Sequence, residues 1–140
     1  EMRRLRLPLA AAALLLAGEQ GIAQSAEDVF GVWRHPENES RVEMFHCGDA
    51  LCARILSIAD DQKTDHKNPD PAKRGRAIVG LVIMSGASPS GPKTWKGELY
   101  NRADGKTYSG TATVKTKDTL ELSGCSMFVF CKTVTWSRVK

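Results

Sequence analysis

Hydrophobic and polar residues alternate along much of the chain after residue 30, a pattern that indicates β-strands with one buried face and one face in water. The clearest run is "TYSGTATV" at 107–114, in which aromatic, small and apolar side chains face one way and hydroxyl side chains the other. Shorter runs of the same kind lie at 42–46, 95–99, 120–122 and 133–138. The alternation therefore predicts antiparallel sheet around one hydrophobic core.

Turn residues separate these runs and bring the number of predicted strands to about eight. Residues 51–58 and the apolar run "AIVGLVIM" at 77–84 are predicted as strands. "SGASPSGPK" at 85–93 is predicted as a loop because of its glycines, prolines and serines. "DG" at 104–105 is a strong hairpin signal, and a short strand is predicted around "GVW" at 31–33.

Most connections between these strands are of hairpin length, as in an up-and-down barrel. The fold class is therefore predicted to be all-β, a single up-and-down antiparallel β-barrel of about eight strands that spans residues 24–140. Closure hides the strand edges that an open antiparallel sheet leaves unpaired. A two-sheet sandwich is the alternative.

The first 23 residues differ from the rest of the chain and are predicted to be a secretory signal peptide. A basic stretch at 2–6 precedes an apolar run at 7–17, and small residues follow at 21–23. This order is typical of a signal peptide, and the apolar run is shorter than the about 20 residues of a membrane span. We therefore expect a periplasmic or secreted protein, with no stable membrane insertion after cleavage of residues 1–23.

The charge of the chain does not indicate a nucleic-acid partner. The sequence has 20 basic and 16 acidic residues, and without residues 1–23 it has 17 and 14, a net charge of +3. The basic residues are scattered and often neighbour acidic ones, as in "ADGK" at 103–106 and "KTKD" at 115–118. A surface that binds nucleic acid concentrates its basic residues, so no such partner is expected.

Four cysteines follow the predicted signal peptide, and an even number in an exported chain predicts two disulfides. Three pairings are possible. "CGDALC" and "CSMFVFC" each have the form of a strand–turn–strand tip, where facing cysteines approach closely enough to bond, and this favours Cys47–Cys52 and Cys125–Cys131. The alternative is a four-cysteine zinc site, but the second pair is wider than the usual C-x₂₋₄-C spacing. No metal and no other cofactor is predicted.

Several motifs in order give the chain a family resemblance. "GVW" at 31–33 and "WSR" at 136–138 resemble the lipocalin-like barrel pattern, in which a first-strand tryptophan packs beside an arginine from the far end of the barrel. With "CGDALCARI" at 47–55, "DHKNPDPAKRGRAIVGL" at 65–81 and "WKGELYNRADGKTYSG" at 95–110, they are similar to a bacterial secreted family, domain of unknown function 2147. The resemblance implies a periplasmic lipocalin-like barrel and implies no activity.

The stretch at 64–81 is a polar candidate for a functional site. Its acidic residues and His66 do not have the spacing of a calcium-binding loop. Its "NPDP" stiffens the backbone, because proline fixes its own φ and holds the preceding residue extended. We interpret the stretch as a rigid connection at the rim of the barrel. Four of its side chains remain candidates for contact with a ligand: Asn68, Asp70, Arg74 and Arg76.

The interior of the predicted barrel is a second candidate site, because an eight-stranded barrel either is filled by side chains or holds one small ligand. The small residues Gly97, Gly110 and Ala112 open a cavity, or else they lie opposite larger side chains in a filled core. The expected wall of such a cavity consists of Trp95, Leu99 and Tyr108.

The tryptophans near the two ends of the barrel domain are predicted to have a structural role. Tryptophan buries a large area, so Trp33 and Trp136 are assigned to the floor of the core rather than to a ligand platform. Arg138 is expected to cover Trp33 or to bind carbonyl groups at the strand ends.

Three functional hypotheses follow from these features. The leading one is a small exported barrel that binds a small, partly apolar ligand at its open end. The second is a protein-interaction module, such as an inhibitor or an envelope-stress factor, with a filled barrel. The third is an enzyme that uses rim residues near His66, which is not favoured because the chain lacks G-x-S-x-G, H-E-x-x-H and a glycine-rich phosphate loop.

Overall fold

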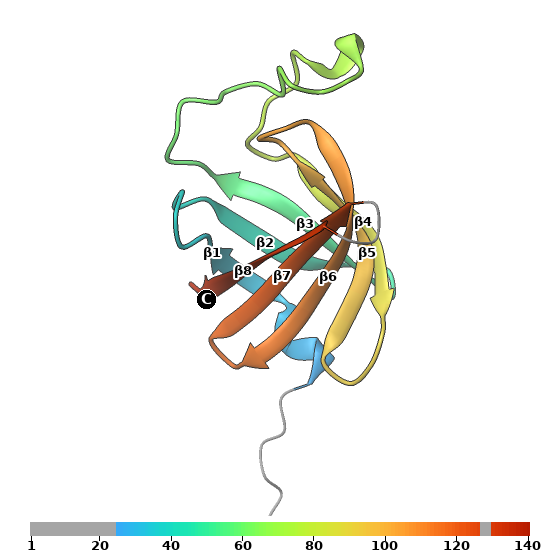
Figure 1. Cartoon of the computed structure of the whole chain (residues 1–140). Coiled ribbons are helices and arrows are strands. Elements are labelled where there is room, and N and C mark those ends of the chain that lie inside the picture. The colour runs from blue at the N-terminus through green and yellow to red at the C-terminus, as the bar shows by residue number, and fades with distance from the viewer. Residues whose placement is uncertain (1–24, 127–129) are drawn as a thin grey trace, which may run out of the picture.

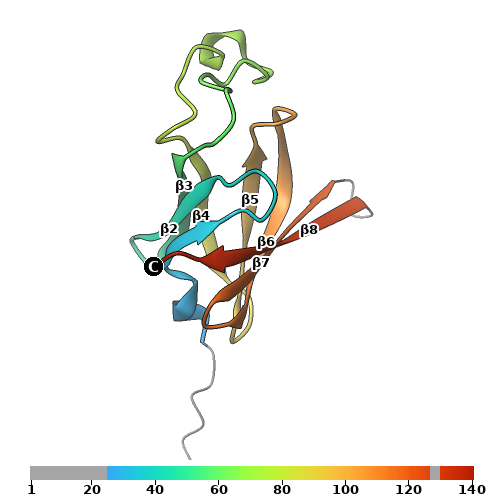
Figure 2. The ribbon, with the colours of Figure 1, turned by 90° about the vertical axis from the view of Figure 1, so that its left-hand side faces the viewer.

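The structure is a computed structural model that describes residues 25–126 and 130–140. Its strands form a closed antiparallel barrel in which each strand pairs with its sequence neighbours and the last pairs with the first. Figures 1 and 2 show the barrel from two sides. The predicted all-β, up-and-down barrel is therefore confirmed. The predicted signal peptide at 1–23 lies outside the described residues.

The strands follow the predicted alternation of buried and exposed positions. They are β1 (Gly31–Arg34), β2 (Arg41–Cys47), β3 (Ala50–Ser57), β4 (Val82–Pro89), β5 (Thr94–Asn101), β6 (Lys106–Thr116), β7 (Thr119–Ser126) and β8 (Phe130–Arg138). Two short 3-10 helices accompany them, η1 (Ala26–Val29) before β1 and η2 (Pro71–Lys73) between β3 and β4.

A short seam between β1 and β8 closes the barrel. Trp33 pairs with Arg138 across this seam. Beyond it, the amide of Val32 donates to the carbonyl of Lys140 and the carbonyl of Val32 accepts from the amide of Val139, both at 2.7 Å. The first and last strands are thus joined by backbone hydrogen bonds over a short stretch at the end of β8.

The prediction of a strand at 77–84 is wrong for its first residues, because β4 begins only at Val82. Residues 78–81 form a turn, in which the amide of Leu81 donates to the carbonyl of Ile78 at 3.0 Å and Gly80 has a φ of +90°. Glycine adopts this φ without the steric cost that other residues have. Ile78 is fully buried and Leu81 is 8% exposed, so the apolar character of this run fits burial in a turn as well as in a strand.

The loop predicted at 85–93 is wrong over its first half, because β4 continues through it to Pro89. The register between β4 and β5 shifts between Met84 and Ser88. Gly86 lies inside this irregularity with a φ of +71°, which allows a bulge instead of a chain break. Glycine in this stretch therefore marks an irregular strand, not a loop.

Two facing glycines allow close packing inside the sheet. Gly97 pairs with Gly110 across β5 and β6. A Cβ atom on Gly97 would lie 2.9 Å from the Cβ of Ala87, and one on Gly110 would lie 2.9 Å from the Cβ of Leu99 and 3.1 Å from the Cε of Met84. Neighbouring apolar side chains already occupy the space beside both glycines.

Both predicted disulfides are present, Cys47–Cys52 between β2 and β3 and Cys125–Cys131 between β7 and β8. Successive connections in an up-and-down barrel alternate between its two ends, so the disulfides lie at opposite ends. Figure 2 shows the β7–β8 hairpin projecting away from the other strands. Each disulfide fixes one hairpin tip.

Candidate functional site

One end of the barrel is closed by η1, which lies below the strands in Figure 1. The indole N–H of Trp33 donates to the carbonyl of Val29, and that of Trp95 donates to the carbonyl of Ala26, both at 2.8 Å. Val29 and Trp33 are fully buried. The backbone of η1 thus satisfies two buried indoles. We call this end, which carries the turns 48–49 and 117–118, the closed end.

Arg138 holds the closed end together from the last strand. Its guanidinium carbon lies 4.2 Å from the centroid of the Trp33 ring, a cation–π distance. Its Nη1 donates to the carbonyl of Phe30 at 3.0 Å, its Nε donates to the carbonyl of Lys117 at 2.6 Å, and its Nη2 donates to the carbonyl of Asp28. The side chain both covers Trp33 and binds backbone carbonyls.

A cavity of about 680 Å³ lies at the opposite end, which we call the open end. Its apolar wall includes Val42, Ile55, Leu99, Leu122, Val134 and Trp136. A polar rim surrounds it, formed by residues of the segments 35–40, 60–62 and 101–104. An apolar body and a few polar groups at the entrance are the usual composition of a small-molecule site.

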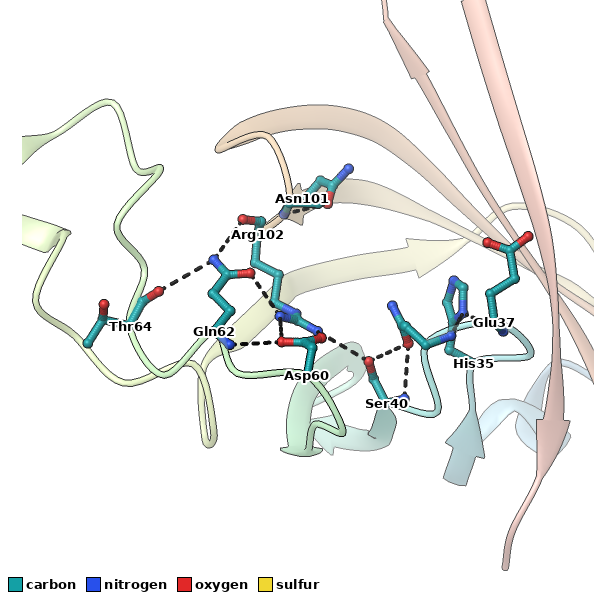
Figure 3. A network of polar contacts seen from close by, with 10 residues as sticks. His35, Glu37, Ser40, Asp60, Gln62, Thr64, Asn101 and Arg102 are labelled. Atoms are coloured by element: carbon teal, nitrogen blue, oxygen red, sulfur yellow. Dashed lines mark hydrogen bonds and ion pairs between the residues drawn. The ribbon is translucent and has the colours of Figure 1, made fainter.

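Arg102 ties the three segments of the rim together (Figure 3). Its Nη1 and Nη2 donate to the two carboxylate oxygens of Asp60 at 3.0 and 2.6 Å, and its Nη1 also donates to Gln62 Oε1 at 2.8 Å. Its Nη2 lies 3.4 Å from Ser40 Oγ. Hydrogen bonding by Arg102 lowers the pKa of Asp60 to about 2, against a smaller opposing effect of burial. The rim is therefore pre-organised without a ligand.

His35 lies where β1 ends at the rim, and its ring is held in the neutral form. Its Nδ1 accepts hydrogen bonds from the backbone amides of Glu37 and Asn38 at 3.1 and 3.2 Å. Burial lowers the pKa of His35, nearby Glu37 raises it, and Lys132 and Arg102 lower it further. Because an amide N–H can only donate, Nδ1 is the acceptor and the proton lies on Nε2.

Trp136 on β8 lines the cavity and contacts His35. The two rings meet edge to face, with centroids 4.9 Å apart and an interplanar angle of 85°. Trp136 is only 8% exposed, yet its indole Nε1 has no hydrogen-bond partner within the described residues. In this respect it differs from Trp33 and Trp95.

The connection 58–81 rises above the barrel in Figure 1 and is braced from inside by Asp65. This side chain is fully buried, and its carboxylate accepts from Tyr100 Oη at 2.5 Å and from Asn68 Nδ2 and Arg76 Nε at 2.9 Å each. Burial raises the pKa of Asp65, but the three hydrogen bonds outweigh it and hold the pKa below its ordinary value. A buried, fully bonded carboxylate of this kind stabilises the loop.

The four ligand candidates of this connection take part in its internal bonding. Asp70 Oδ1 accepts from the amide of Ala72 at 3.0 Å and caps η2. Arg74 Nε donates to the carbonyl of Asn68 at 2.8 Å, and Arg76 pairs with Asp65. The cavity wall contains none of these four described residues: Asn68, Asp70, Arg74 and Arg76.

The three interior candidates separate into two groups. Leu99 and Tyr108 line the cavity, and the hydroxyl of Tyr108 donates to Asp104 on the rim. Trp95 lies at the closed end, where it bonds to η1 and meets the ring of Phe30 edge to face at 5.6 Å. The structure therefore brings two of the three together at the open end.

His35 and Arg102 were not predicted from the sequence, and Trp136, which was assigned to the floor of the core, instead lines the cavity at the open end beside His35. No motif marks these residues, because the rim is assembled from segments far apart in the chain. The direction of the strands is the signal that was available. In an up-and-down barrel, the connections after β1, β3 and β5 all lie at one end, and this rule alone places 35–40, 58–81 and 101–104 together.

His66 offers little to an enzymatic hypothesis. Its ring is exposed, and its Nδ1 lies 3.3 Å from the carbonyl of Thr64. Among the described residues, no three histidine, cysteine, aspartate or glutamate side chains gather as metal ligands would. Nor does the described part of the chain contain a helix with the length and hydropathy of a membrane span.

Comparisons with known proteins agree with this architecture. The model of the family DUF2147, described as an uncharacterized protein conserved in bacteria, matches residues 31–138. A solved structure of HP1028 from the human pathogen Helicobacter pylori, described as a member of the lipocalin family, is similar with a TM-score of 0.72 and 29% identity. The similarity covers 80% of this chain and 83% of that one. No curated protein matches the chain.

Proposed function

The chain belongs to the DUF2147 family of bacterial proteins, and on that premise we propose that it is a small exported barrel that binds one small, partly apolar ligand in the cavity at its open end. The observation that carries the proposal is the cavity itself. Its volume of about 680 Å³ lies within the range of about 300–1,000 Å³ that small-molecule sites occupy.

The composition of the cavity supports a ligand with apolar surface. Val42 and Ile55, 2% and 3% exposed, form a closely packed apolar base. Leu99 and Val134 also line the cavity and are only half-buried. A ligand that covers Leu99 and Val134 removes apolar surface from water, which is worth about 25 cal/mol per Å² before the costs of association. The pre-bonded rim around Arg102 then limits the ordering that binding requires.

An exported location is part of the proposal. Two disulfides, Cys47–Cys52 and Cys125–Cys131, support it, because disulfides persist in the periplasm and outside the cell and are rare in the cytosol. A bacterial family fits the same location. Fractionation of cells that produce the full chain tests this part separately from binding, and recovery of the protein in the cytoplasm with reduced thiols would reject it.

Binding is tested with an apolar, environment-sensitive fluorescent dye and two matched variants on β8. Val134 lines the cavity, and its neighbour Thr135 is exposed on the outside of the barrel. Val134→Trp fills part of the cavity and is expected to weaken dye binding about tenfold, as if two methylene groups were no longer buried. Thr135→Trp adds the same side chain outside and should leave binding unchanged.

The dye titration also separates the proposal from its alternatives. The oxidised wild-type protein is expected to bind the dye saturably, one molecule per chain. A protein-interaction module with a filled barrel would show no saturation, and a surface patch would respond to Thr135→Trp as strongly as to Val134→Trp. Denaturant unfolding of both variants checks that any loss of binding is not loss of fold.

A further inference from the structure

The open end contains hydrogen-bond donors without acceptors, and the first of them is the indole N–H of Trp136. The indole N–H groups of Trp33 and Trp95 are bonded to backbone carbonyls at 2.8 Å, whereas that of Trp136 has no partner within the described residues. Burying a donor without an acceptor is unfavourable, because the group loses its hydrogen bond to water. Because the Trp136 side chain lines the cavity, a bound ligand is the natural source of the missing acceptor.

A second donor lies beside the first. The two backbone bonds to His35 Nδ1 place the ring proton on Nε2, and no acceptor among the described residues bonds to Nε2. The His35 and Trp136 rings touch edge to face, so two ring N–H donors belong to one contiguous part of the wall.

Three acceptor groups near this part of the wall are already engaged. Asn38 Oδ1 accepts from the amide and the hydroxyl of Ser40, and Asn101 Oδ1 accepts from the amide of Ala103. Their oxygens are therefore used by the protein, and each side-chain amide presents its NH₂ group instead. The carboxylate of Asp60 is likewise bonded on both oxygens.

The formal charges that line the cavity do not favour an anion, because the acidic residues Glu37, Asp60 and Asp104 outnumber the basic residues Arg102 and Lys132 by one. Arg102 is neutralised by Asp60 at 2.6 Å. Glu37 and Lys132 are exposed cavity residues of opposite sign, and neither forms an ion pair within the part of the chain that the structure describes. Their fields oppose each other at His35, because Glu37 raises the pKa of that ring and Lys132 lowers it. The wall offers hydrogen-bond donors without an excess of positive charge.

We propose that the ligand is an uncharged molecule with a carbonyl-type acceptor oxygen that lies against Trp136 and His35, and with an apolar body that fills the cavity. This inference rests on the proposed function and deepens it by naming the ligand's chemical class. The oxygen supplies the acceptor that the two ring N–H groups lack, and the apolar body covers Ile55, Leu122 and Val134.

The direct test follows the three indole N–H signals by NMR in the intact oxidised protein. 2-Decanone, which carries a carbonyl, is expected to move the Trp136 signal downfield and to leave those of Trp33 and Trp95 in place. Decane, which has no acceptor, should occupy the cavity without a downfield movement of the Trp136 signal. Trp136→Phe removes the signal and assigns it.

Affinity gives the second readout, measured by displacement of the apolar dye. Trp136→Phe removes one N–H donor and keeps an aromatic ring, so it is expected to weaken binding of 2-decanone about 2- to 10-fold and to change binding of decane less. Protonated decylamine offers donors and a positive charge only and should bind most weakly. Decanoate tests the effect of a negative charge on the ligand. The protein is expected to bind decanoate with an affinity within about tenfold of that for 2-decanone.

The outcomes distinguish this inference from the proposed function. If neither decane nor 2-decanone displaces the dye, both proposals fail. If both displace it, but Trp136→Phe affects them equally and the Trp136 signal does not move, the barrel binds apolar ligands and the acceptor inference is wrong. Binding of decanoate more than tenfold tighter than the ketone, with strong salt dependence, would replace the uncharged ligand with an anion.

Discussion

The two ends of this barrel use the same kind of side chain in opposite ways. At the closed end, Trp33 and Trp95 fill the core and bond to the backbone of η1. At the open end, Trp136 borders a cavity of about 680 Å³ and has no bonding partner within the described residues. The closed end and the candidate binding site thus lie at opposite ends of one barrel.

The largest expected effect is the loss of a large side chain at the closed end. Trp33→Ala removes a fully buried ring that packs under Arg138, and we expect a loss of about 3–5 kcal/mol in the free energy of unfolding. Trp136→Ala should cost roughly half as much, because its ring already borders empty space. Urea denaturation of both variants measures the difference, and equal losses would contradict the contrast between the ends.

The disulfides offer a comparison of intermediate size. Replacing Cys47 and Cys52 by serine, or Cys125 and Cys131 by serine, is expected to cost about 2 kcal/mol in either case, since the loops are similarly short, with sequence separations of 5 and 6. Only the second change lies at the open end, where Cys131 lines the cavity. It alone should weaken dye binding. A loss of binding after removal of Cys47–Cys52 would show that the two ends are not independent.

A smaller effect isolates the indole hydrogen bond. Trp33→Phe loses ring volume and its bond to Val29, whereas Trp136→Phe loses ring volume and no bond within the described residues. The first variant should therefore be less stable than the second by about 1 kcal/mol. Thermal and denaturant unfolding of the pair check this, and a Trp136 variant that is the less stable of the two would reject an unsatisfied N–H.

Lowering the pH slightly below neutrality is expected to reduce stability less than these substitutions do. It should act first on the open end. The pKa of His35 is lowered by burial, so protonation of the unfolded chain below about pH 6.5 begins to favour unfolding. The lowered pKa values of Asp60 and Asp65 add stability that is fully present above their unfolded pKa and is lost as pH falls through the lower folded pKa, so these two residues respond only to stronger acid. Hydrogen-exchange protection should therefore fall first at 35–40 as pH drops below about 6.5 and at 58–81 in stronger acid, in each case before it falls at the closed end.

Local patterns predicted most of the fold, and their failures have physical causes. Alternation identified β6 and β8, and cysteine spacing identified both disulfides, because these signals depend on neighbours in sequence. The start of β4 was missed because Gly80 and Gly86 favour a turn and a bulge that depend on contacts with other strands. The residues of the buried turn at 78–81 are as apolar as those of a strand, so hydrophobicity alone did not distinguish the two.

The candidate site was less predictable than the fold. Leu99 and Tyr108 were found by alternation, which reports the inward face of a strand. Trp95 shares that face but lies at the closed end, since alternation does not report depth along the barrel. The role of Asp65 in bracing 58–81 depends on Tyr100, which is 35 residues away. Such partners become visible only when the barrel closes.

The most direct test of the account locates the ligand along the barrel axis. Methyl NMR spectra of the oxidised protein, recorded during titration with 2-decanone, report both ends at once. We expect saturable changes at Ile55 and Leu122, which line the cavity, and none of similar size at Val29 and Leu51, which are fully buried. Changes concentrated at Val29 and Leu51, or shifts that never saturate, would contradict a binding site at the open end.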